Sequence, residues 1–233
     1  MTTKPIIVRD LFFSYGNSLI LENINFECNM GEFVAIVGKS GVGKSSLLKV
    51  LAQFEKSKGE IIISNNIGYV FQSYSLFPWM TLEENVEFAL SGISKIEKKS
   101  IVSSILKKVG LSDLSNRYPT QLSGGQAQRG SIARAVATNP DVLLMDEPFA
   151  ACDHHTREKL QEWLLDVWMD FRMTVIFVTH SIEEAIYLSD KVIVLNNRKF
   201  EAEIKISFPR PRSGEIRFSN DFQAIKHQIL ERM

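Results

Sequence analysis

A glycine-rich segment, residues 38–45, has the residue types and spacing of a phosphate-binding loop. It reads Gly38-Lys39-Ser40-Gly41-Val42-Gly43-Lys44-Ser45, the pattern G-x-x-x-x-G-K-[ST], and Ser46 follows it. The glycines allow backbone N–H groups to turn toward phosphate oxygens, and a helix that begins near Gly43 adds its positive dipole end. The Lys44 ammonium can then reach the β- and γ-phosphates of a nucleotide, and the Ser45 hydroxyl can ligate Mg²⁺. Residues 38–46 are therefore predicted to hold the phosphates of a nucleotide.

Two adjacent carboxylates, Asp146 and Glu147, follow the apolar run 142–145, which is typical of a buried strand. Ligands of parallel α/β sheets bind at the carboxyl ends of the strands, so both side chains are expected near the phosphate loop. There Asp146 would hold Mg²⁺ through water, and Glu147 would polarise the attacking water as a general base. A strand that ends in Asp-Glu is more often simply solvated, so this assignment depends on the loop at 38–45.

A second segment that could bind an anion is Leu122-Ser123-Gly124-Gly125-Gln126. These residues precede a predicted helix that extends to about residue 137, and the start of a helix attracts anions. One complete phosphate cradle is already present, so a single chain has no obvious use for another. Two copies arranged head to tail would use both, because each nucleotide would lie between residues 38–45 of one copy and residues 122–126 of the other.

Together these motifs resemble those of the ATP-binding-cassette (ABC) family, in the family's order and across nearly the whole chain. The resemblance implies that Tyr15 stacks on adenine, that Gln72 lies at the metal, that Asp153 forms the D-loop and that His180 is the switch histidine. It implies ATP and Mg²⁺ as cofactors. The catalytic residues expected on this basis are Lys44, Gln72, Glu147 and His180, and the expected metal ligands are Ser45, Gln72 and Asp146.

One motif departs from the family pattern. The D-loop reads Ala150-Ala151-Cys152-Asp153, where the family usually has Ser or Gly, Ala, Leu and Asp. The aspartate is kept, and the departures at Ala150 and Cys152 are expected to alter contacts across a dimer. The stretch 55–68 is also short, which predicts that one hairpin is trimmed.

The segment after Gln72 indicates which members of the ABC family the chain most resembles. Residues 76–86 read LFPWMTLEENV, similar to the ATPases of importers for nitrate, sulfonate, taurine or thiamine precursors. In that family this region receives a short helix of the permease, and Phe77, Pro78 and Trp79 are apolar groups suited to such a contact. Packing within the chain itself is an equal alternative for Trp79. The resemblance implies a twin copy, a permease and, indirectly, a solute-binding protein as partners, on the cytoplasmic side of the cell membrane.

Two other functions stay open at this point. An exporter or lipoprotein-release ATPase would share all of this chemistry and differ only in its partner. An ABC ATPase that acts on nucleic acid or ribosomes is less favoured, because the chain has a single cassette, no heptad tract and 27 basic against 27 acidic residues. Balanced charge gives no overall electrostatic attraction to nucleic acid. The transported solute cannot be predicted from these residues.

The elements that must position these residues follow from hydrophobic patterning. Strands are predicted at 6–8 and 19–26, with 12–16 between them, and a doubly buried strand at 33–37. Capping boxes at Thr81 and Ser94 should start helices, and Gly110 should end the second. A helix at 159–171, a strand at 175–178, a helix capped by Ser181, a hairpin through 196–197 and a final helix from Asp221 complete the prediction.

The expected fold is therefore α/β. It has a P-loop NTPase core of a mixed sheet flanked by helices, an N-terminal antiparallel β subdomain and an inserted all-helical subdomain. The chain of 233 residues is expected to be one ABC ATPase domain, with 1–72 and 136–233 as the catalytic lobe and 73–135 as the helical signature lobe. Because 45% of its residues are hydrophobic, a disordered or fibrous chain is excluded. No apolar stretch approaches the roughly 18–20 residues that cross a bilayer.

Several conspicuous residues are expected to play no chemical part. Cys28 and Cys152 match no metal or redox spacing and are interpreted as incidental or buried thiols. His154 and His155 would point about 100° apart on a helix, too far for one metal, and are interpreted as surface residues. Core packing is expected for Trp163 and Trp168. A solvated edge is expected for Arg210, Arg212 and Arg217.

Overall fold

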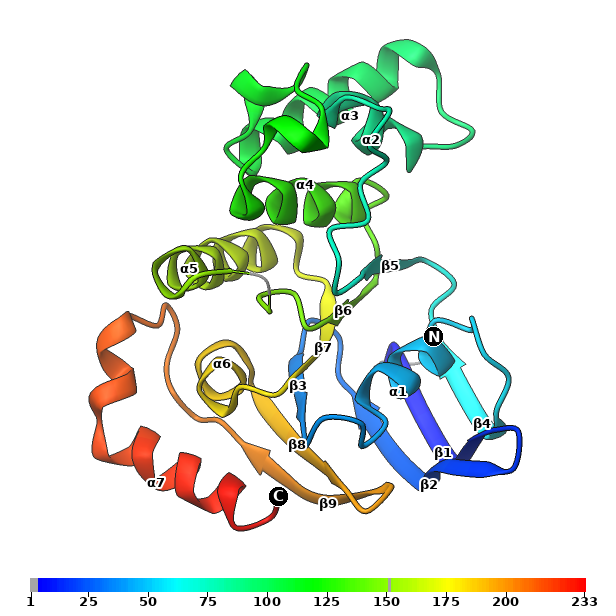
Figure 1. Ribbon diagram of the computed structural model, residues 1–233, viewed down its shortest axis with the longest axis vertical. Coiled ribbons are helices and arrows are strands. Elements are labelled where there is room, and N and C mark those ends of the chain that lie inside the picture. The colour runs from blue at the N-terminus through cyan, green and yellow to red at the C-terminus, as the bar shows by residue number, and fades with distance from the viewer. Residues whose placement is uncertain (1–3, 151) are drawn as a thin grey trace. The chain divides into compact units, whose positions relative to one another are not determined.

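The computed structural model describes residues 4–150 and 152–233, and their contacts divide into two compact units (Figure 1). Unit 1 holds the described residues up to Asn65, together with Leu144–Glu147 and Thr174–Met233. Unit 2 holds Asn66–Leu143 and the described part of Pro148–Met173. The catalytic and signature lobes expected from the sequence have other boundaries, and they stay a prediction.

Unit 1 is built on the predicted parallel strands. β3 (Phe33–Val37) pairs in parallel with β7 (Thr174–Thr179) on one side and β8 (Lys191–Asn196) on the other. In the same sheet, β6 (Val142–Asp146) lies next to β7, and β9 (Lys199–Lys205) lies next to β8. The pairing of β8 with β9 is antiparallel. Every residue of β3 and β7 is buried, which explains why these strands are continuous apolar runs.

A second, antiparallel sheet of unit 1 has the order β2-β1-β4. β1 is Ile6–Tyr15, β2 is Ser18–Cys28 and β4 is Lys58–Ile63. The first two strands are longer than predicted, and residues 12–15 belong to β1 instead of lying between strands. Irregular register, with Asp10 at a φ of 47°, interrupts the alternation and hides the strand in the sequence.

The helices of unit 1 are α1 (Lys44–Leu51), α6 (Ile182–Leu188) and α7 (Asn220–Leu230). A short 3₁₀ turn, Gly214–Phe218, precedes α7. The predicted cap of α6 is confirmed, because the Ser181 hydroxyl accepts the N–H of Glu184. The hairpin of β8 and β9 is also confirmed.

The three C-terminal arginines correct an expectation, because they do not form a solvated edge. Arg212 is 6% exposed and donates to the carbonyls of Ile186, Tyr187 and Ser189 at 3.1, 2.8 and 2.8 Å. Arg210 pairs with Asp190 at 2.7 Å, and Arg217 lies over the Tyr187 ring at 3.9 Å. The reason is that the last carbonyls of α6 have no partner within the helix, and a guanidinium can satisfy several of them. Burial lowers the pKa of Arg212 to about 10.

Unit 2 is mostly helical. Its helices are α2 (Leu82–Phe88), α3 (Lys95–Lys108), α4 (Gly124–Val136) and α5 (His154–Phe171), with 3₁₀ turns at Ser112–Leu114 and Pro119–Gln121 and the strand β5 (Ile67–Val70) beside β6. The capping box at Thr81 is confirmed. Ser94 accepts the N–H of Glu97, and Gly110 follows α3 at a φ of 65°, as predicted for the end of that helix. α5 begins five residues before the predicted start, at His154, because Asp153 caps it.

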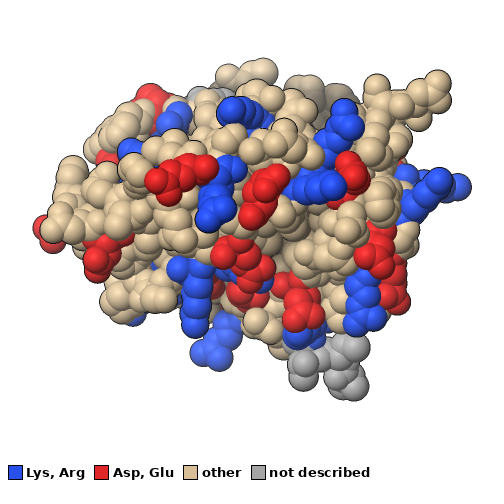
Figure 2. Space-filling model, turned by 90° about the horizontal axis from the view of Figure 1, so that it is seen from below, with Lys and Arg blue, Asp and Glu red and all other residues tan. Residues whose placement is uncertain are grey.

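The surface of the face in Figure 2 carries Lys and Arg interspersed with Asp and Glu, with no broad region of one sign. This distribution agrees with the balanced composition of the chain. Cys28 and Cys152 are both buried, and burial raises the pKa of Cys28 to about 12. Among the described residues, no helix combines the length and apolar character needed to cross a bilayer.

Candidate active site

The glycine-rich loop joins the end of β3 to the start of α1 within unit 1. A side chain at position 38 has no room, because a Cβ added to Gly38 would lie 2.3 Å from the Leu195 carbonyl oxygen. Gly43, the N-cap of α1, has a φ of 113°, and no side chain of the described residues caps the helix there. The first N–H groups of α1 are therefore left for an acceptor from outside the chain, which a phosphate can provide.

The Lys44 ammonium is held inside this loop. Lys44 is 5% exposed, and its Nζ donates to the Gly38 and Lys39 carbonyls at 2.8 and 3.1 Å. Burial lowers the pKa of Lys44, while Glu147 and Asp146 oppose that effect. The cation thus occupies the centre of the loop on neutral acceptors, which it can exchange for phosphate oxygens.

Ser45 and Asp146 meet although 101 positions separate them in the chain. The Ser45 hydroxyl donates to Asp146 Oδ1 at 2.8 Å. Asp146 ends β6 and is 7% exposed, and burial raises its pKa, although the hydrogen bond from Ser45 opposes this. A hydroxyl and a buried carboxylate are hard oxygen donors of the kind that Mg²⁺ takes together with substrate phosphates. Two such donors leave the other positions of the ion to water and to phosphate oxygens, which is usual for Mg²⁺ at a nucleotide.

Glu147 and His180 form the second pair at this edge of the sheet. His180 Nδ1 lies 3.1 Å from Glu147 Oε2, and the carboxylate side chain is far less exposed than the ring. Glu147 has a φ of 43°, and its N–H donates to the Val178 carbonyl at 3.0 Å. This left-handed backbone is uncommon for a residue with a side chain, and it turns the chain directly after β6. The geometry suits a base that a neighbouring imidazole orients.

Tyr15 ends β1, in unit 1, with 43% of its surface exposed. Its ring meets Phe13 edge to face at a centroid distance of 4.7 Å. That contact orients the Tyr15 ring, and the exposed part of its surface leaves room for a planar ligand to stack. The expected role on adenine stays a prediction.

The signature segment lies in unit 2 at the start of α4. Ser123 is the N-cap, and its hydroxyl accepts the Gln126 N–H at 3.3 Å, while Gln126 Oε1 accepts the Ser123 N–H at 2.8 Å. This reciprocal pair is a complete capping box. A Cβ at Gly125 would lie 2.7 Å from Thr156 Cγ2, so the glycine permits α4 to pack closely on α5.

The D-loop and Gln72 also lie in unit 2. Asp153 Oδ1 accepts the Thr156 N–H at 3.1 Å, and its hydrogen bonds with Thr156 lower the pKa of Asp153. Ala151 is outside the described residues, and Cys152 is buried. Gln72 is exposed just beyond β5. The structure therefore brings together Lys44, Ser45, Asp146, Glu147 and His180 within unit 1, while the roles given to Gln72, Ser123 and Asp153 stay predictions.

Sequence reasoning missed Asn85, a fully buried residue on α2. Its side chain accepts the Phe77 N–H at 2.7 Å and donates to the carbonyls of Phe77, Met80 and Thr81 at 3.2, 3.1 and 2.9 Å. These four bonds hold the loop that presents Trp79, which is 68% exposed. The only signal was a polar residue on the apolar face of a short helix.

A groove of about 470 Å³ lies beside this loop in unit 2. The residues that line it include the aromatic side chains of Tyr69, Phe71, Phe77 and Phe88, together with Arg134. Phe88 is 60% exposed, and the Arg134 guanidinium lies 5.2 Å from the Phe77 ring centroid. An exposed aromatic groove of this kind is suited to an apolar segment of another protein.

Comparison with known sequences finds ATP-binding proteins of ABC transporters. The family model described as "ABC transporter" matches residues 21–150. An aliphatic sulfonates import ATP-binding protein, SsuB of Bacillus cereus, is 43% identical over 227 residues, which cover 93% of this chain and 89% of SsuB. An ABC transporter ATP-binding protein of Methanocaldococcus jannaschii, MJ0412, is 43% identical over 234 residues, covering 94% of this chain and 86% of that protein.

Solved structures match as well. The dimeric ATP-binding cassette MJ0796 in a post-hydrolysis state with ADP and Pi has a TM-score of 0.75 and 34% identity, covering 88% of this chain and all of that one. CbiO1 of Clostridium perfringens, part of the transporter complex cbiONQ, has a TM-score of 0.83 and 25% identity, covering 98% and 96%. The expected α/β fold, a mixed sheet with an antiparallel N-terminal sheet, is confirmed by the strand pairing and by these structures.

Proposed function

Because this chain belongs to the ABC transporter family, we propose that it is the ATP-hydrolysing subunit of an importer for a small solute. The set of Lys44, Ser45, Asp146, Glu147 and His180 in unit 1 carries this proposal. The identity to SsuB supports import and favours an aliphatic sulfonate or a related anion as the solute.

ATP binding uses the glycine-rich loop and its surroundings. The triphosphate accepts N–H groups at the start of α1 and replaces the two carbonyls that Lys44 contacts, while adenine stacks on Tyr15. Residues 38–46 line the phosphates.

Ser45, Asp146 and Gln72 would hold the Mg²⁺ ion, with Asp146 acting through water. When bound, the ion supplies positive charge to the β- and γ-phosphates. The position of Asp146 supports this assignment, because its carboxylate is buried at the end of β6 and accepts the Ser45 hydroxyl, so two hard oxygen donors lie side by side.

Glu147 acts as the general base of hydrolysis. Its carboxylate accepts a proton from the water that attacks the γ-phosphate, and the bond to Nδ1 of His180 orients that carboxylate. The left-handed backbone at Glu147 fixes where the side chain leaves the end of β6.

A second copy of the chain completes each site. Residues 122–126 of the twin would add Ser123 and the start of α4 to the γ-phosphate, and Asp153 would contribute to the contact between copies. The dimer of the relative MJ0796 supports this arrangement. Residues 73–135 would then be the signature lobe of a two-lobed ATPase, and 1–72 with 136–233 the catalytic lobe.

The aromatic groove and Trp79 would receive a helix of an integral membrane permease. The subunit would lie on the cytoplasmic face of the cell membrane, and a solute-binding protein would deliver solute to the permease. The exposure of Trp79 favours this role over packing within unit 2.

Two measurements test the proposal. Hydrolysis should rise more steeply than linearly with protein concentration, because two chains build each site. A polytopic membrane protein should co-purify from detergent extract with the wild-type chain and with Phe218→Ala, which alters an exposed aromatic side chain in unit 1, but much less with Trp79→Ala. Recovery with ribosomes or DNA instead, or strict linearity with dilute protein, would contradict it.

A further inference from the structure

The two residues that flank His180 are tied together by a closed chain of hydrogen bonds within unit 1. The Thr179 hydroxyl donates to Oε2 of Glu184 at 2.6 Å and accepts the Ser181 N–H at 3.0 Å. The Ser181 hydroxyl in turn accepts the N–H of Glu184 at 3.3 Å. Thr179 ends β7 and Ser181 caps α6, so these bonds join the strand to the helix across His180.

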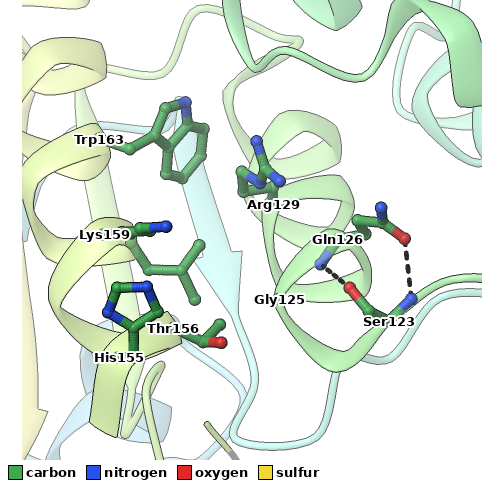
Figure 3. Close-up of a pocket in the computed structure, with 9 residues that line it drawn as sticks. Ser123, Gly125, Gln126, Arg129, His155, Thr156, Lys159 and Trp163 are labelled. Atoms are coloured by element: carbon green, nitrogen blue, oxygen red, sulfur yellow. Dashed lines mark hydrogen bonds between the residues drawn. The ribbon is translucent and has the colours of Figure 1, made fainter. Parts of the chain in front are cut away.

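This arrangement differs from an ordinary capping box. At the start of α4 the side chain of Gln126 accepts the Ser123 N–H directly, as Figure 3 shows. At the start of α6 the Thr179 hydroxyl stands between the corresponding groups, which are the Glu184 carboxylate and the Ser181 N–H. The cap therefore extends one step beyond the helix and includes the last residue of β7.

These hydrogen bonds are buried and anchored to the sheet. Thr179 is 2% exposed and Glu184 is 7% exposed. At 2.6 Å, the bond between them has the length of a hydroxyl that donates to an ionised carboxylate, which is the stronger kind of hydrogen bond. Thr179 also pairs with Val37, the residue before Gly38, in the register of β7 with β3. The backbone on both sides of His180 is therefore fixed relative to the start of the glycine-rich loop.

The His180 side chain extends from this backbone to the proposed base. Its Nδ1 lies 3.1 Å from Glu147 Oε2, although 59% of the His180 side chain is exposed. Because little of the ring is enclosed by packing, its position depends on how firmly the backbone at residue 180 is held. A misplacement of about 1 Å can slow a reaction about 100-fold. The hydrogen bonds around His180 can thus affect hydrolysis without touching the nucleotide.

We propose that Thr179 and Glu184 are positioning residues for ATP hydrolysis, which act by holding His180 against Glu147. This inference rests on the proposed function, because it requires that His180 and Glu147 take part in hydrolysis. Loss of the Thr179 hydroxyl would release the Ser181 N–H and the Glu184 carboxylate at once. Since both positioning residues act through His180, they should affect the rate of hydrolysis and not the binding of ATP.

Thr179→Val tests the inference, because valine is close in shape to threonine and lacks its hydroxyl. At saturating ATP, kcat should fall about 10–100-fold, while KM and the affinity for a fluorescent ATP analogue stay unchanged. Thr179→Ser keeps a hydroxyl and should retain most of the turnover. Glu184→Gln weakens the charge-assisted bond and should lower kcat several-fold, less than Glu184→Leu does. Glu183→Gln, which alters an exposed neighbouring carboxylate, is the matched control and should hydrolyse ATP normally.

A double-mutant cycle separates positioning from stability. In a chain that carries His180→Ala, adding Thr179→Val should slow the remaining hydrolysis by less than about twofold, because no imidazole is left to hold. A role in stability alone would lower turnover by the same factor with and without His180. Thermal unfolding of each variant, measured beside turnover, shows how much stability the substitution costs.

Two results would overturn the inference while the proposed function stands, provided that His180→Ala alone is slow. One is a normal kcat in Thr179→Val, and the other is an equal loss of turnover in the two backgrounds. If Thr179→Val does not fold, Glu184→Gln takes its place in the cycle and is judged in the same way. If His180→Ala hydrolyses ATP at the wild-type rate, both this inference and the role given to His180 are wrong.

Discussion

The two helices that are assigned to phosphate, α1 and α4, begin in opposite ways. α1 starts at Gly43, which offers no side-chain cap, whereas α4 starts at Ser123 with a complete capping box. The first N–H groups of α1 have no side-chain cap, whereas one of the first N–H groups of α4, that of Gln126, already donates to Ser123. The start of α1 is thus dedicated to its ligand, and the start of α4 is stable without one.

The energies of these hydrogen bonds indicate how the two helix starts differ in binding phosphate. A side-chain cap stabilises a helix by about 0.5–2 kcal/mol, and a hydrogen bond to a charged group contributes about 1.5–3 kcal/mol. Phosphate that displaces the Ser123 cap therefore gains little, whereas phosphate at α1 displaces no cap. This balance favours a sequence in which α1 binds ATP first and α4 joins only when a second copy already holds the nucleotide in place.

Lys44→Ala should have the largest effect, because it removes the cation at the start of α1. The ATP affinity should fall by roughly 30- to 5,000-fold, since truncating one partner of a desolvated charge pair costs about 2–5 kcal/mol. Turnover should be lost with it. Equilibrium titration with a fluorescent ATP analogue measures the change, and Lys49→Ala, on the same helix, is the matched control. Unchanged affinity would remove Lys44 from the phosphate site.

Glu147→Gln should separate ATP binding from ATP hydrolysis. The amide cannot accept a proton from water, so turnover should fall by about 10²–10⁴-fold while ATP still binds. Release of phosphate at saturating ATP, measured beside the binding titration, tests this expectation. Near-normal hydrolysis would refute the role of Glu147 as the base.

Ser123→Ala, at the start of α4, should reduce turnover less than the two preceding variants. Turnover at saturating ATP should fall about 10–100-fold, because one bond to a charged phosphate is lost, while ATP binding by dilute single chains is unchanged. The lost cap should also lower the free energy of unfolding by ~1 kcal/mol.

Ser94→Ala is the control for this variant, since Ser94 caps α3 in the same manner. It should lose similar stability but keep its turnover. If the two variants lose turnover equally, the effect of Ser123→Ala is one of helix stability alone.

Gln126→Ala should have the smallest effect. It removes the acceptor for the Ser123 N–H but leaves the Ser123 hydroxyl on its own N–H partner. Thermal unfolding should show a loss of about 0.5–1 kcal/mol, and turnover should fall less than in Ser123→Ala. A larger loss of turnover than in Ser123→Ala would mean that the glutamine, and not the serine, is the ligand of the phosphate.

The parts predicted well from sequence are those that local patterns determine. The glycine-rich loop, the apolar strand before Asp146 and the caps at Thr81 and Ser181 each depend on neighbours within a few residues. The geometry of the site could not be predicted in the same way. The contact of Ser45 with Asp146 spans 101 positions, and Glu147, whose backbone is left-handed, donates its N–H to Val178 in a different strand.

Residues whose partners are distant carbonyls were the least predictable. Arg212 follows a Pro-rich, polar stretch that is typical of an exposed turn, yet it is buried against the end of α6. Asn85 holds a loop by four bonds that no short motif encodes. Both place a polar group where backbone carbonyls would otherwise lack donors, and only the folded chain brings those carbonyls together.

The hydrogen bonds from Arg212 to the carbonyls at the end of α6 limit where this chain can be shortened or fused to another protein. A truncation upstream of position 212 would remove the donor for three carbonyls at once, although every residue of the nucleotide site would be intact. A shortened chain or a fusion should therefore keep the segment through Arg212. A reporter protein attached after that segment would leave these hydrogen bonds intact.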